Sequence, residues 1–424
     1  MLDIKFIREN PEAVKQGAAA KNADVDVYRV IEIDEKRRLL LSQLESLQAT
    51  KNSVSKEIPK LSPADREAKI LEMKNVDVQS EKVRAELDAA EKEFNALMLN
   101  IPNLPKEDVK IGKDDSENYV IRTAGEPTRF PFKPKDYMEL GAALDIIDTE
   151  RAAKTSGARF GFLKGGGALL EIAILNFTIA KLLKHGFKLI LPPYMVKEEI
   201  MRGMGYLEHG GIEEVYYLEK DGLYLIGTSE QVIGGMHAGE ILKAEDLPLR
   251  YAGFSSCFRR EAGSYGKDTK GILRVHQFDK IEMFSFTTPQ ESDKEHDFLL
   301  SVEEELMRDL KLPYQVLGIC SGDLGDSAAR KYDIETWIPS QEKYRETHST
   351  STTTDFQSRR LNIRYKNKET GKNELVHILN GTAFAMGRII IAIIENYQQE
   401  DGSVRIPEVL QPYMFGVNKL VVGR

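Results

Sequence analysis

Residues 256–286 read SCFRREAGSYGKDTKGILRVHQFDKIEMFSF, and this stretch decides the fold that we expect for the chain. Two apolar-flanked segments enclose a loop rich in Gly and Lys, a pattern that predicts two strands joined by a long loop. On such strands Arg259 and Arg274 would face an anionic ligand across a sheet, while Glu261 and Glu282 accept hydrogen bonds from its donors. A surface hairpin with a solvated charged loop is the alternative, and this stretch alone does not separate the two.

A segment near the C-terminus favours the ligand site. Residues 379–397 read LNGTAFAMGRIIIAIIENY, a polar turn leading into an apolar helix that is interrupted by Arg388. An arginine in such a run is costly to bury unless an anion or a carboxylate meets it. Taken together, the Phe-Arg-x-Glu element at 258–261 and the Gly-Arg element at 387–388 resemble motifs 2 and 3 of the class II aminoacyl-tRNA synthetases. Their detail resembles the seryl-tRNA synthetase family, and the resemblance extends over essentially the whole chain.

The composition is ordinary for a globular protein with room for two domains. The chain has 424 residues, of which 41% are apolar and 30% charged. A formal net charge of -8 argues against indiscriminate nucleic-acid binding, so local basic patches must make any RNA contact.

Targeting signals are not expected. The N-terminus, MLDIKFIREN, is charged from its third residue, which predicts neither a signal nor a transit peptide. We expect no membrane-spanning segment, because the longest apolar run, residues 389–394, is far too short. Cys257 and Cys320 cannot build a disulfide framework and lack metal-ligand spacing, so the reducing cytoplasm is the natural compartment.

Heptad spacing predicts a long helical hairpin near the N-terminus, after one short helix within residues 1–26. Apolar or aliphatic-stemmed positions alternate spacings of three and four, which is the pattern of a coiled-coil seam. They are Ile33, Arg37, Leu40, Leu44, Leu47, Lys51, Val54 and Ile58, followed by Met73, Val76, Ser80, Val83, Leu87, Ala90, Phe94 and Leu97. Ser62 as N-cap and Pro63 at the first helical position restart the second helix. About 35 residues per helix would span roughly 50 Å.

The hairpin has two interpretations. A bare coiled coil is more often a scaffold or dimerisation element than an RNA-binding one. Resemblance to the family implies that the hairpin holds the long variable arm of tRNA(Ser). Basic residues near the tip would supply phosphate contacts, and they are Lys51, Lys56, Lys60, Arg66, Lys69 and Lys74.

We expect three regions along the chain. Residues 1–105 form the tRNA-binding arm, the proline-rich segment 106–134 is a linker, and residues 135–424 form the catalytic domain. A helix over 171–185, a strand over 187–191 and Pro193 resemble motif 1, which implies a homodimer because this element builds the dimer interface in the family. Signals of a Rossmann-type catalytic domain are absent. The expected fold is therefore α+β, with the coiled-coil hairpin and a mixed, mainly antiparallel sheet flanked by helices.

The resemblance implies an ATP site with its arginines on the phosphates. Arg259 would bind the α-phosphate, Arg274 the β- or γ-phosphate and Arg388 the γ-phosphate. Arg259 and Arg388 are the residues implied to be catalytic. Glu261 would accept from the adenine amino group, and Phe278 would stack on the adenine ring. The residues implied to bind ATP are Arg259, Arg260, Glu261, Arg274, Val275, Phe278, Glu346, Thr347, His348, Ser349 and Arg388.

The resemblance also implies a metal ion and an amino-acid pocket. Glu346 and Ser349 would hold Mg²⁺, a hard cation that prefers oxygen ligands, although such a Ser/Thr-rich run is more often an ordinary loop. The residues implied to bind L-serine are Thr228, Ser229, Glu230, Glu282, Asn380 and Thr382. We expect Thr228 and Glu230 to share one face of a strand, because residues two apart in a strand point the same way.

These residue types suit aminoacyl adenylation. A serine carboxylate is already ionised at neutral pH, so the reaction needs positioning and charge neutralisation rather than a general base. The expected reactions are the ATP-dependent activation of L-serine to seryl-adenylate and transfer of the seryl group to tRNA(Ser). Whether tRNA(Sec) is charged as well stays open.

Two alternatives belong to other classes of protein. One is a class II synthetase for another small amino acid, or a paralogue that loads a carrier protein, which would have no use for the long arm. The other is an RNA-binding or coiled-coil interaction protein with an inactive nucleotide fold. The intact set of charged residues argues against the second, since an inactive site has no need of all of them.

Overall fold

The computed structural model describes residues 1–262 and 271–422, apart from the side chains of Lys60 and Ala64. Most of the loop predicted between two strands, residues 263–270, therefore lies outside the described residues, as does the side chain of Lys60. The chain divides into two compact units, Met1–Pro102 and Asn103–Arg424.

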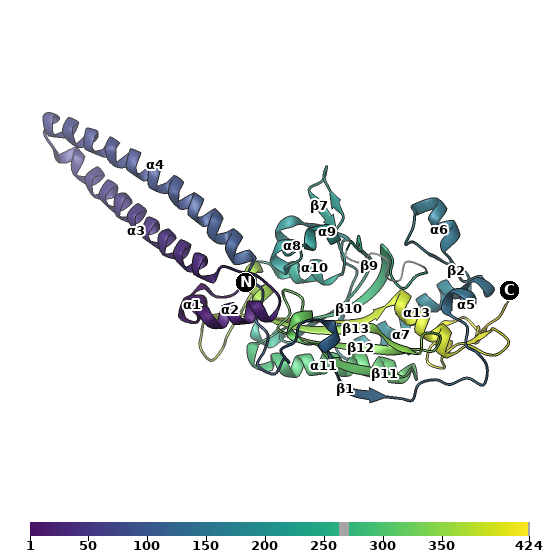
Figure 1. Cartoon of the computed structure of the whole chain (residues 1–424). Coiled ribbons are helices and arrows are strands. Elements are labelled where there is room, and N and C mark those ends of the chain that lie inside the picture. The colour runs from purple at the N-terminus through teal and green to yellow at the C-terminus, as the bar shows by residue number, and fades with distance from the viewer. Residues whose placement is uncertain (263–270, 423–424) are drawn as a thin grey trace. The chain divides into compact units, whose positions relative to one another are not determined.

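The first unit contains the expected hairpin of two long helices (Figure 1). Its elements are α1 (Ile4–Glu9), α2 (Pro11–Ala20), α3 (Val27–Glu57), the short 3-10 helix η1 (Ile58–Lys60) and α4 (Pro63–Leu99). Leu40, Leu87 and Ala90 are buried in the seam between α3 and α4, which confirms the coiled-coil prediction. Two short helices precede the hairpin where one was expected, because Pro11 begins a new helix after Asn10.

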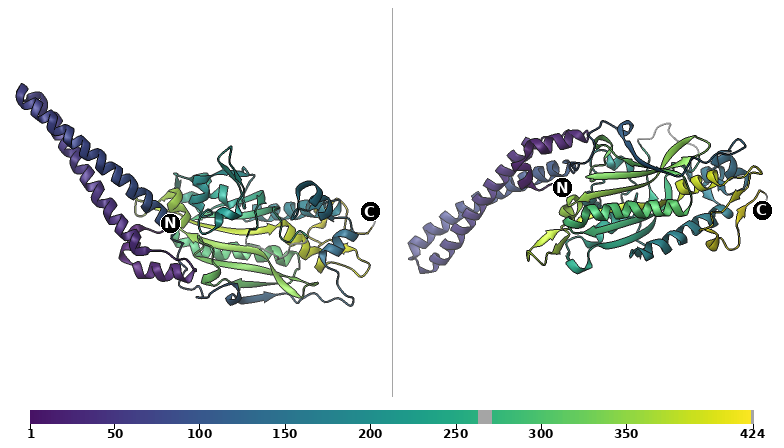
Figure 2. Two further views of the ribbon diagram at one scale, coloured as in Figure 1. Left: turned by 45° about the horizontal axis from the view of Figure 1, so that its top comes forward. Right: turned by 90° about the horizontal axis from the view of Figure 1, so that it is seen from below.

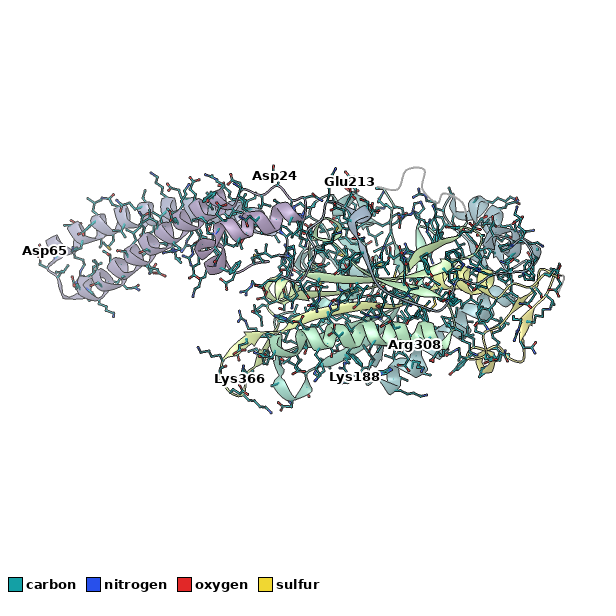
Figure 3. All side chains as sticks on the ribbon, turned by 60° about the horizontal axis from the view of Figure 1, so that its bottom comes forward. Asp24, Asp65, Lys188, Glu213, Arg308 and Lys366 are labelled. Carbon is teal, nitrogen blue, oxygen red and sulfur yellow. The ribbon has the colours of Figure 1, made fainter. Side chains whose placement is uncertain are left out.

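The turn of the hairpin follows known capping chemistry. Ser62 accepts a hydrogen bond from the backbone N–H of Asp65 at 3.3 Å, and Pro63 takes the first helical position. Asp65 marks this tip in Figure 3.

The second unit is built on an eight-stranded sheet of order β1-β11-β12-β13-β16-β10-β9-β4. Its strands are β1 (Tyr119–Ala124), β11 (Tyr314–Gly318), β12 (Arg330–Ile338), β13 (Lys343–Thr354), β16 (His377–Ala385), β10 (Gln277–Thr287), β9 (Leu249–Phe258) and β4 (Lys188–Ile190). Neighbours pair antiparallel, except that β4 runs parallel to β9. The mixed, mainly antiparallel sheet is thereby confirmed.

Smaller elements surround this sheet. The helices are α5 (Tyr137–Ala143), α6 (Thr149–Ser156), α7 (Gly166–Lys184), α8 (Glu198–Met204), α9 (Gly211–Glu214), α10 (Glu230–Ile233), α11 (Ser292–Asp309), α12 (Phe356–Leu361) and α13 (Met386–Asn396). Four minor sheets contain β2 (Ile147–Asp148) and β3 (Phe162–Leu163); β5 (Met195–Lys197), β6 (Tyr217–Leu218) and β7 (Leu223–Leu225); β8 (Ile241–Lys243), β14 (Arg364–Lys366) and β15 (Asn373–Leu375); and β17 (Val404–Arg405) and β18 (Lys419–Leu420).

One face of the large sheet packs into the main apolar core. Ile281 and Met283 of β10 and Leu379 of β16 are fully buried there, together with residues of α7, α11 and α13. Figure 2 shows α11 lying along the strands. Because side chains alternate along a strand, the residues between these point to the opposite face, where the candidate site lies.

One expectation needs correction. The segment predicted as a linker, residues 106–134, contains β1, which pairs with β11 at the edge of the large sheet. This segment therefore belongs to the second unit, and its prolines interrupt helices without excluding a short strand. Among the described residues, one helix, α7, is long and apolar enough to cross a membrane by length and composition alone. A core helix passes the same test, and Leu170, Ile174 and Leu182 of α7 are buried in the core.

Candidate active site

A cavity of about 670 Å³ opens on the face of the sheet opposite the main core, and it gathers most of the predicted site residues. Those that line it are Thr228, Glu230, Arg259, Glu261, Arg274, Val275, Phe278, Glu282, Glu346, Thr347, Ser349, Asn380, Thr382 and Arg388. They come from β9, β10, β13, β16, α13 and the segments beside them. The tertiary fold therefore joins residues that are as much as 160 positions apart in the sequence.

Three arginines, Arg259, Arg274 and Arg388, line the cavity. Arg259 follows β9, where its Nε donates to the carbonyl of Gly227 at 3.1 Å and its guanidinium lies 5.3 Å from the centre of the Phe278 ring. Arg274 pairs with Glu261 through Nη1 and Oε2 at 2.7 Å. Guanidinium groups with free donors beside an aromatic ring suit a nucleotide, since the ring can stack on a base while the cations meet its phosphates.

Arg388 reaches the cavity from α13. It lies in the first turn of α13 rather than within the buried run, so the helix buries residues 389–394 while Arg388 stays partly exposed. Its Nη1 lies 3.0 Å from both Oε1 and the backbone carbonyl of Glu346. Burial alone would raise the pKa of the Glu346 carboxyl, but the positive charges of Arg388, Lys331 and Arg259 outweigh burial and hold the pKa well below its usual value.

A β-bulge brings Glu346 and Ser349 together. In a regular strand, residues three apart point to opposite faces. Between β12 and β13, however, Ile334 pairs with His348 and Glu335 with Glu346, so Thr347 is one extra residue on β13. The bulge turns Glu346 onto the face that carries Ser349, and both line the cavity. Their two side-chain oxygens are the kind of donor that Mg²⁺ prefers.

The other end of the cavity carries carboxylates and hydroxyls. Glu282 of β10 lies opposite Thr382 of β16, whose hydroxyl donates to Glu282 Oε2 at 3.4 Å. Lys280, two residues earlier on β10, forms an ion pair with Glu282. These groups are buried, so a small polar ligand at this end would meet fixed, desolvated partners.

Thr228 and Glu230 line this end, but not as a strand. β7 ends at Leu225, and Glu230 begins α10, so the predicted strand geometry is wrong. The turn between them brings the Glu230 backbone N–H within 3.4 Å of the Thr228 hydroxyl oxygen. Burial raises the pKa of Glu230 to about 7, and the neighbouring charge of Glu282 acts in the same direction.

The side chains of three predicted residues do not reach the cavity. Ser229 is fully buried and donates to the carbonyl of Gly253 at 3.2 Å. Arg260 donates to the carbonyl of Val215 and lies over the ring of Tyr216. His348 follows the bulge on β13, so it faces the core.

In the core, the His348 ring packs against the Phe384 ring, and burial lowers the pKa of His348 to about 3. Local backbone direction, which the motif does not reveal, separates these three residues from their neighbours.

Sequence reasoning missed several cavity residues. Lys280 could have been found, because it alternates with Phe278 and Glu282 along one strand. Lys331 and Ser351 occupy paired positions on β12 and β13 and gave no motif signal. A further wall includes Glu208, His209 and Asp326, and His209 Nδ1 lies 2.6 Å from Asp326 Oδ2 across it.

In the arm, several of the basic residues expected to contact RNA have partners within the hairpin. Lys51 pairs with Asp77, and Lys69 with Glu72. Arg66 donates to backbone carbonyls of the turn. An exposed ion pair is weak, at about 0–1 kcal/mol, so a phosphate can compete for these lysines.

Comparisons with known proteins agree with this geometry. Residues 215–397 match the tRNA synthetase class II core domain (G, H, P, S and T), and residues 1–105 match the seryl-tRNA synthetase N-terminal domain. The fold and the cavity are those of a class II aminoacyl-tRNA synthetase.

Individual relatives show which family within this class the chain belongs to. The serine–tRNA ligase of Thermobifida fusca is 48% identical over 98% of this chain and 97% of its own length. That of Geobacter sulfurreducens is 46% identical over 99% of this chain and 100% of its own. The crystal structure of seryl-tRNA synthetase from Pyrococcus horikoshii complexed with ATP matches with a TM-score of 0.92 and 38% identity, covering 100% of both chains. The chain belongs to the seryl-tRNA synthetase family.

Proposed function

We propose that this chain activates L-serine with ATP as seryl-adenylate and then transfers the seryl group to tRNA(Ser). The observation that carries the proposal is the meeting of Arg259 and Arg388, from different elements, at one cavity whose other end is lined by Thr228, Glu282 and Thr382. Such a cavity has a cationic end for a triphosphate and a polar, acidic end for a small amino acid.

The first reaction joins the serine carboxylate to the α-phosphorus of ATP. One carboxylate oxygen forms the new bond to phosphorus, and the bond to the pyrophosphate oxygen breaks in line. Charge accumulates on the α-phosphoryl oxygens and on the leaving group, where the bidentate guanidinium groups of Arg259 and Arg388 are the matching partners. Phe278 would stack on the adenine, and Glu261 would accept from its amino group.

Selection of serine rests on the buried polar end. The α-ammonium of serine suits the carboxylates of Glu230 and Glu282, and its hydroxyl suits the remaining donors and acceptors at Thr228, Asn380 and Thr382. A site built to bond a hydroxyl rejects alanine strongly, by up to roughly 10⁴, because its own buried groups would be left unpaired. Threonine would be rejected by the size of its extra methyl group.

Mg²⁺ fits the donors that the bulge in β13 brings together. Glu346 and Ser349 would hold it through side-chain oxygens, and the bound ion would neutralise phosphate charge. Among the residues that the structure describes, no group of three His, Cys, Asp or Glu side chains is placed to hold a metal. The remaining ligands would therefore be phosphate oxygens and water, as is usual for Mg²⁺.

Residues 1–105 would serve as the tRNA-binding arm and residues 135–424 as the catalytic domain. The match of residues 1–105 to the seryl-tRNA synthetase N-terminal domain supports the first assignment. Exposed lysines near the tip of the hairpin would contact tRNA phosphates, and the seryl group would pass to a terminal ribose hydroxyl of the tRNA. A charging assay with tRNA(Sec) in place of tRNA(Ser) tests whether tRNA(Sec) is a second acceptor of the seryl group.

A homodimer in the cytoplasm is the proposed form of the enzyme. Strand β4 is an edge of the large sheet, where Leu189 is 41% exposed, and Leu191, which directly follows the strand, is 72% exposed. Ile172 of α7, the helix that packs on β4, is also exposed. An apolar sheet edge of this kind is unfavourable in water and suits a second copy of the chain. Analytical ultracentrifugation of the purified protein measures its oligomeric state directly.

The experiment that tests the proposed function is the exchange of labelled pyrophosphate into ATP, measured separately with each amino acid. Serine is expected to stimulate exchange strongly, and alanine, glycine and threonine weakly. Stimulation by glycine or threonine in place of serine would overturn the substrate assignment. Exchange with serine but no charging of tRNA(Ser) would overturn the second step alone.

A further inference from the structure

Asp333 lies directly behind one of the two proposed magnesium ligands. It stands on β12, directly opposite Ser349 of β13 in the antiparallel pairing, so the two side chains lie next to each other on one face of the sheet. Asp333 is 7% exposed. Among the described residues, its Oδ1 atom has no hydrogen-bond partner. A buried carboxylate oxygen without a partner is costly, so a donor is expected to meet it when the site is occupied.

Lys331 supplies the counter-charge. Its Nζ atom lies 3.1 Å from Asp333 Oδ2, and it lines the cavity on the same face as Ser349. Its charge also acts on Glu346. The charge of Lys331 thus acts on both carboxylates, Asp333 through an ion pair and Glu346 through the space of the cavity.

The chemistry of a hydroxyl ligand requires such an arrangement. A serine hydroxyl has one hydrogen and two lone pairs. To bind a cation, its oxygen must turn a lone pair toward the ion, so its hydrogen must point elsewhere. An ionised carboxylate is only an acceptor and therefore takes that hydrogen, which fixes the orientation of the hydroxyl.

We propose that Asp333 is a positioning residue that accepts the Ser349 hydrogen and so directs the Ser349 oxygen toward Mg²⁺, while Lys331 neutralises Asp333 so that the ion is not drawn onto it. This inference rests on the proposed function, because it takes Glu346 and Ser349 as the magnesium ligands. It adds two side chains, Asp333 and Lys331, which no motif of the sequence indicated.

The test uses Mn²⁺ as the probe, with the full-length protein and a non-hydrolysable ATP analogue. Free Mn²⁺ is measured by electron paramagnetic resonance, so the readout does not depend on activity. Asp333→Asn is expected to weaken Mn²⁺ binding about 10- to 100-fold, as is typical when the partner of a metal ligand is removed. The asparagine amide can donate to Ser349, which would use the lone pair that the metal needs. Affinity for the analogue without metal should not change.

Asp401 offers a matched control outside the cavity. Asp401 accepts a hydrogen bond from the Ser403 hydroxyl, and its Oδ2 lies 2.9 Å from Lys419 Nζ. An aspartate, a serine and a lysine are thus grouped there as they are at Asp333. Asp401→Asn should leave Mn²⁺ binding unchanged. Asp333→Ala serves as a second variant if the asparagine protein does not fold.

A double-mutant comparison separates positioning from a general structural effect. If Asp333 acts through Ser349, the variant with both Asp333→Asn and Ser349→Ala binds Mn²⁺ no more weakly than Ser349→Ala alone. Additive losses, or normal Mn²⁺ binding by Asp333→Asn when Ser349→Ala is impaired, would overturn the inference and leave the metal site standing. If Glu346→Gln and Ser349→Ala both bind Mn²⁺ normally, the proposed metal site itself is wrong.

Discussion

Glu230 is a buried carboxylate whose ionisation opposes folding. We propose that its ionised form binds the ammonium group of serine. Burial raises its pKa from 4.5 to about 7, with Glu282 adding to the effect. That rise corresponds to about 3 kcal/mol of destabilisation of the ionised form. The folded protein binds more protons than the unfolded chain between these two pKa values, so this group lowers stability as pH rises through about 4.5 to 7.

We therefore expect Glu230→Gln to stabilise the protein and to impair serine binding. At pH 8 the free energy of unfolding of the variant should exceed that of the parent by about 3 kcal/mol, and near pH 5 by under about 1 kcal/mol, because the protonated acid resembles the amide. In pyrophosphate exchange, KM for serine should rise about 10- to 150-fold, the cost of one charged hydrogen bond of about 1.5–3 kcal/mol. The parent's KM should itself rise below about pH 7, whereas that of the variant should stay flat.

Urea unfolding at the two pH values, together with exchange kinetics from pH 6 to 8.5, measures both effects. Glu400→Gln is the matched control, because Glu400 is exposed and should change neither quantity. A variant with unchanged stability at pH 8 would refute the electrostatic reasoning. An unchanged KM for serine would remove Glu230 from the amino-acid site.

Three further outcomes test other parts of the structure. Arg388→Ala should reduce serine-dependent exchange by at least about 100-fold while tRNA affinity in a filter-binding assay stays the same; equal losses of both would contradict its role at the phosphates. Gly381→Ala should lower the free energy of unfolding by about 1–3 kcal/mol, because the new methyl group would lie 3.0 Å from Oε1 of the buried Glu303. Gly325→Ala is the control and should leave the free energy of unfolding unchanged, because its methyl group would meet open space. Deletion of residues 28–98 should spare exchange and cripple tRNA charging, and an undiminished charging rate would count against the arm as the tRNA-binding element.

The sequence by itself determined the elements whose signals are local. Heptad spacing, Ser62 and Pro63 were sufficient to place the hairpin and its turn, because helix seams and caps depend on residues within a few positions of each other. The Arg259 and Arg388 motifs predicted two arginines that line one cavity in the folded chain. These motifs are defined by residue type and spacing, which can be read from the sequence without knowledge of the fold.

Only the tertiary structure decided which of the remaining side chains point into the cavity and which point into the core. The bulge at Thr347 puts Glu346 beside Ser349 and turns His348 to the core, although simple alternation predicts otherwise. Asp333 and Lys331 matter because β12 pairs with β13 in one particular register. Register and bulges are set by pairing between distant segments and by the burial of one sheet face, so no single stretch of sequence contains that information.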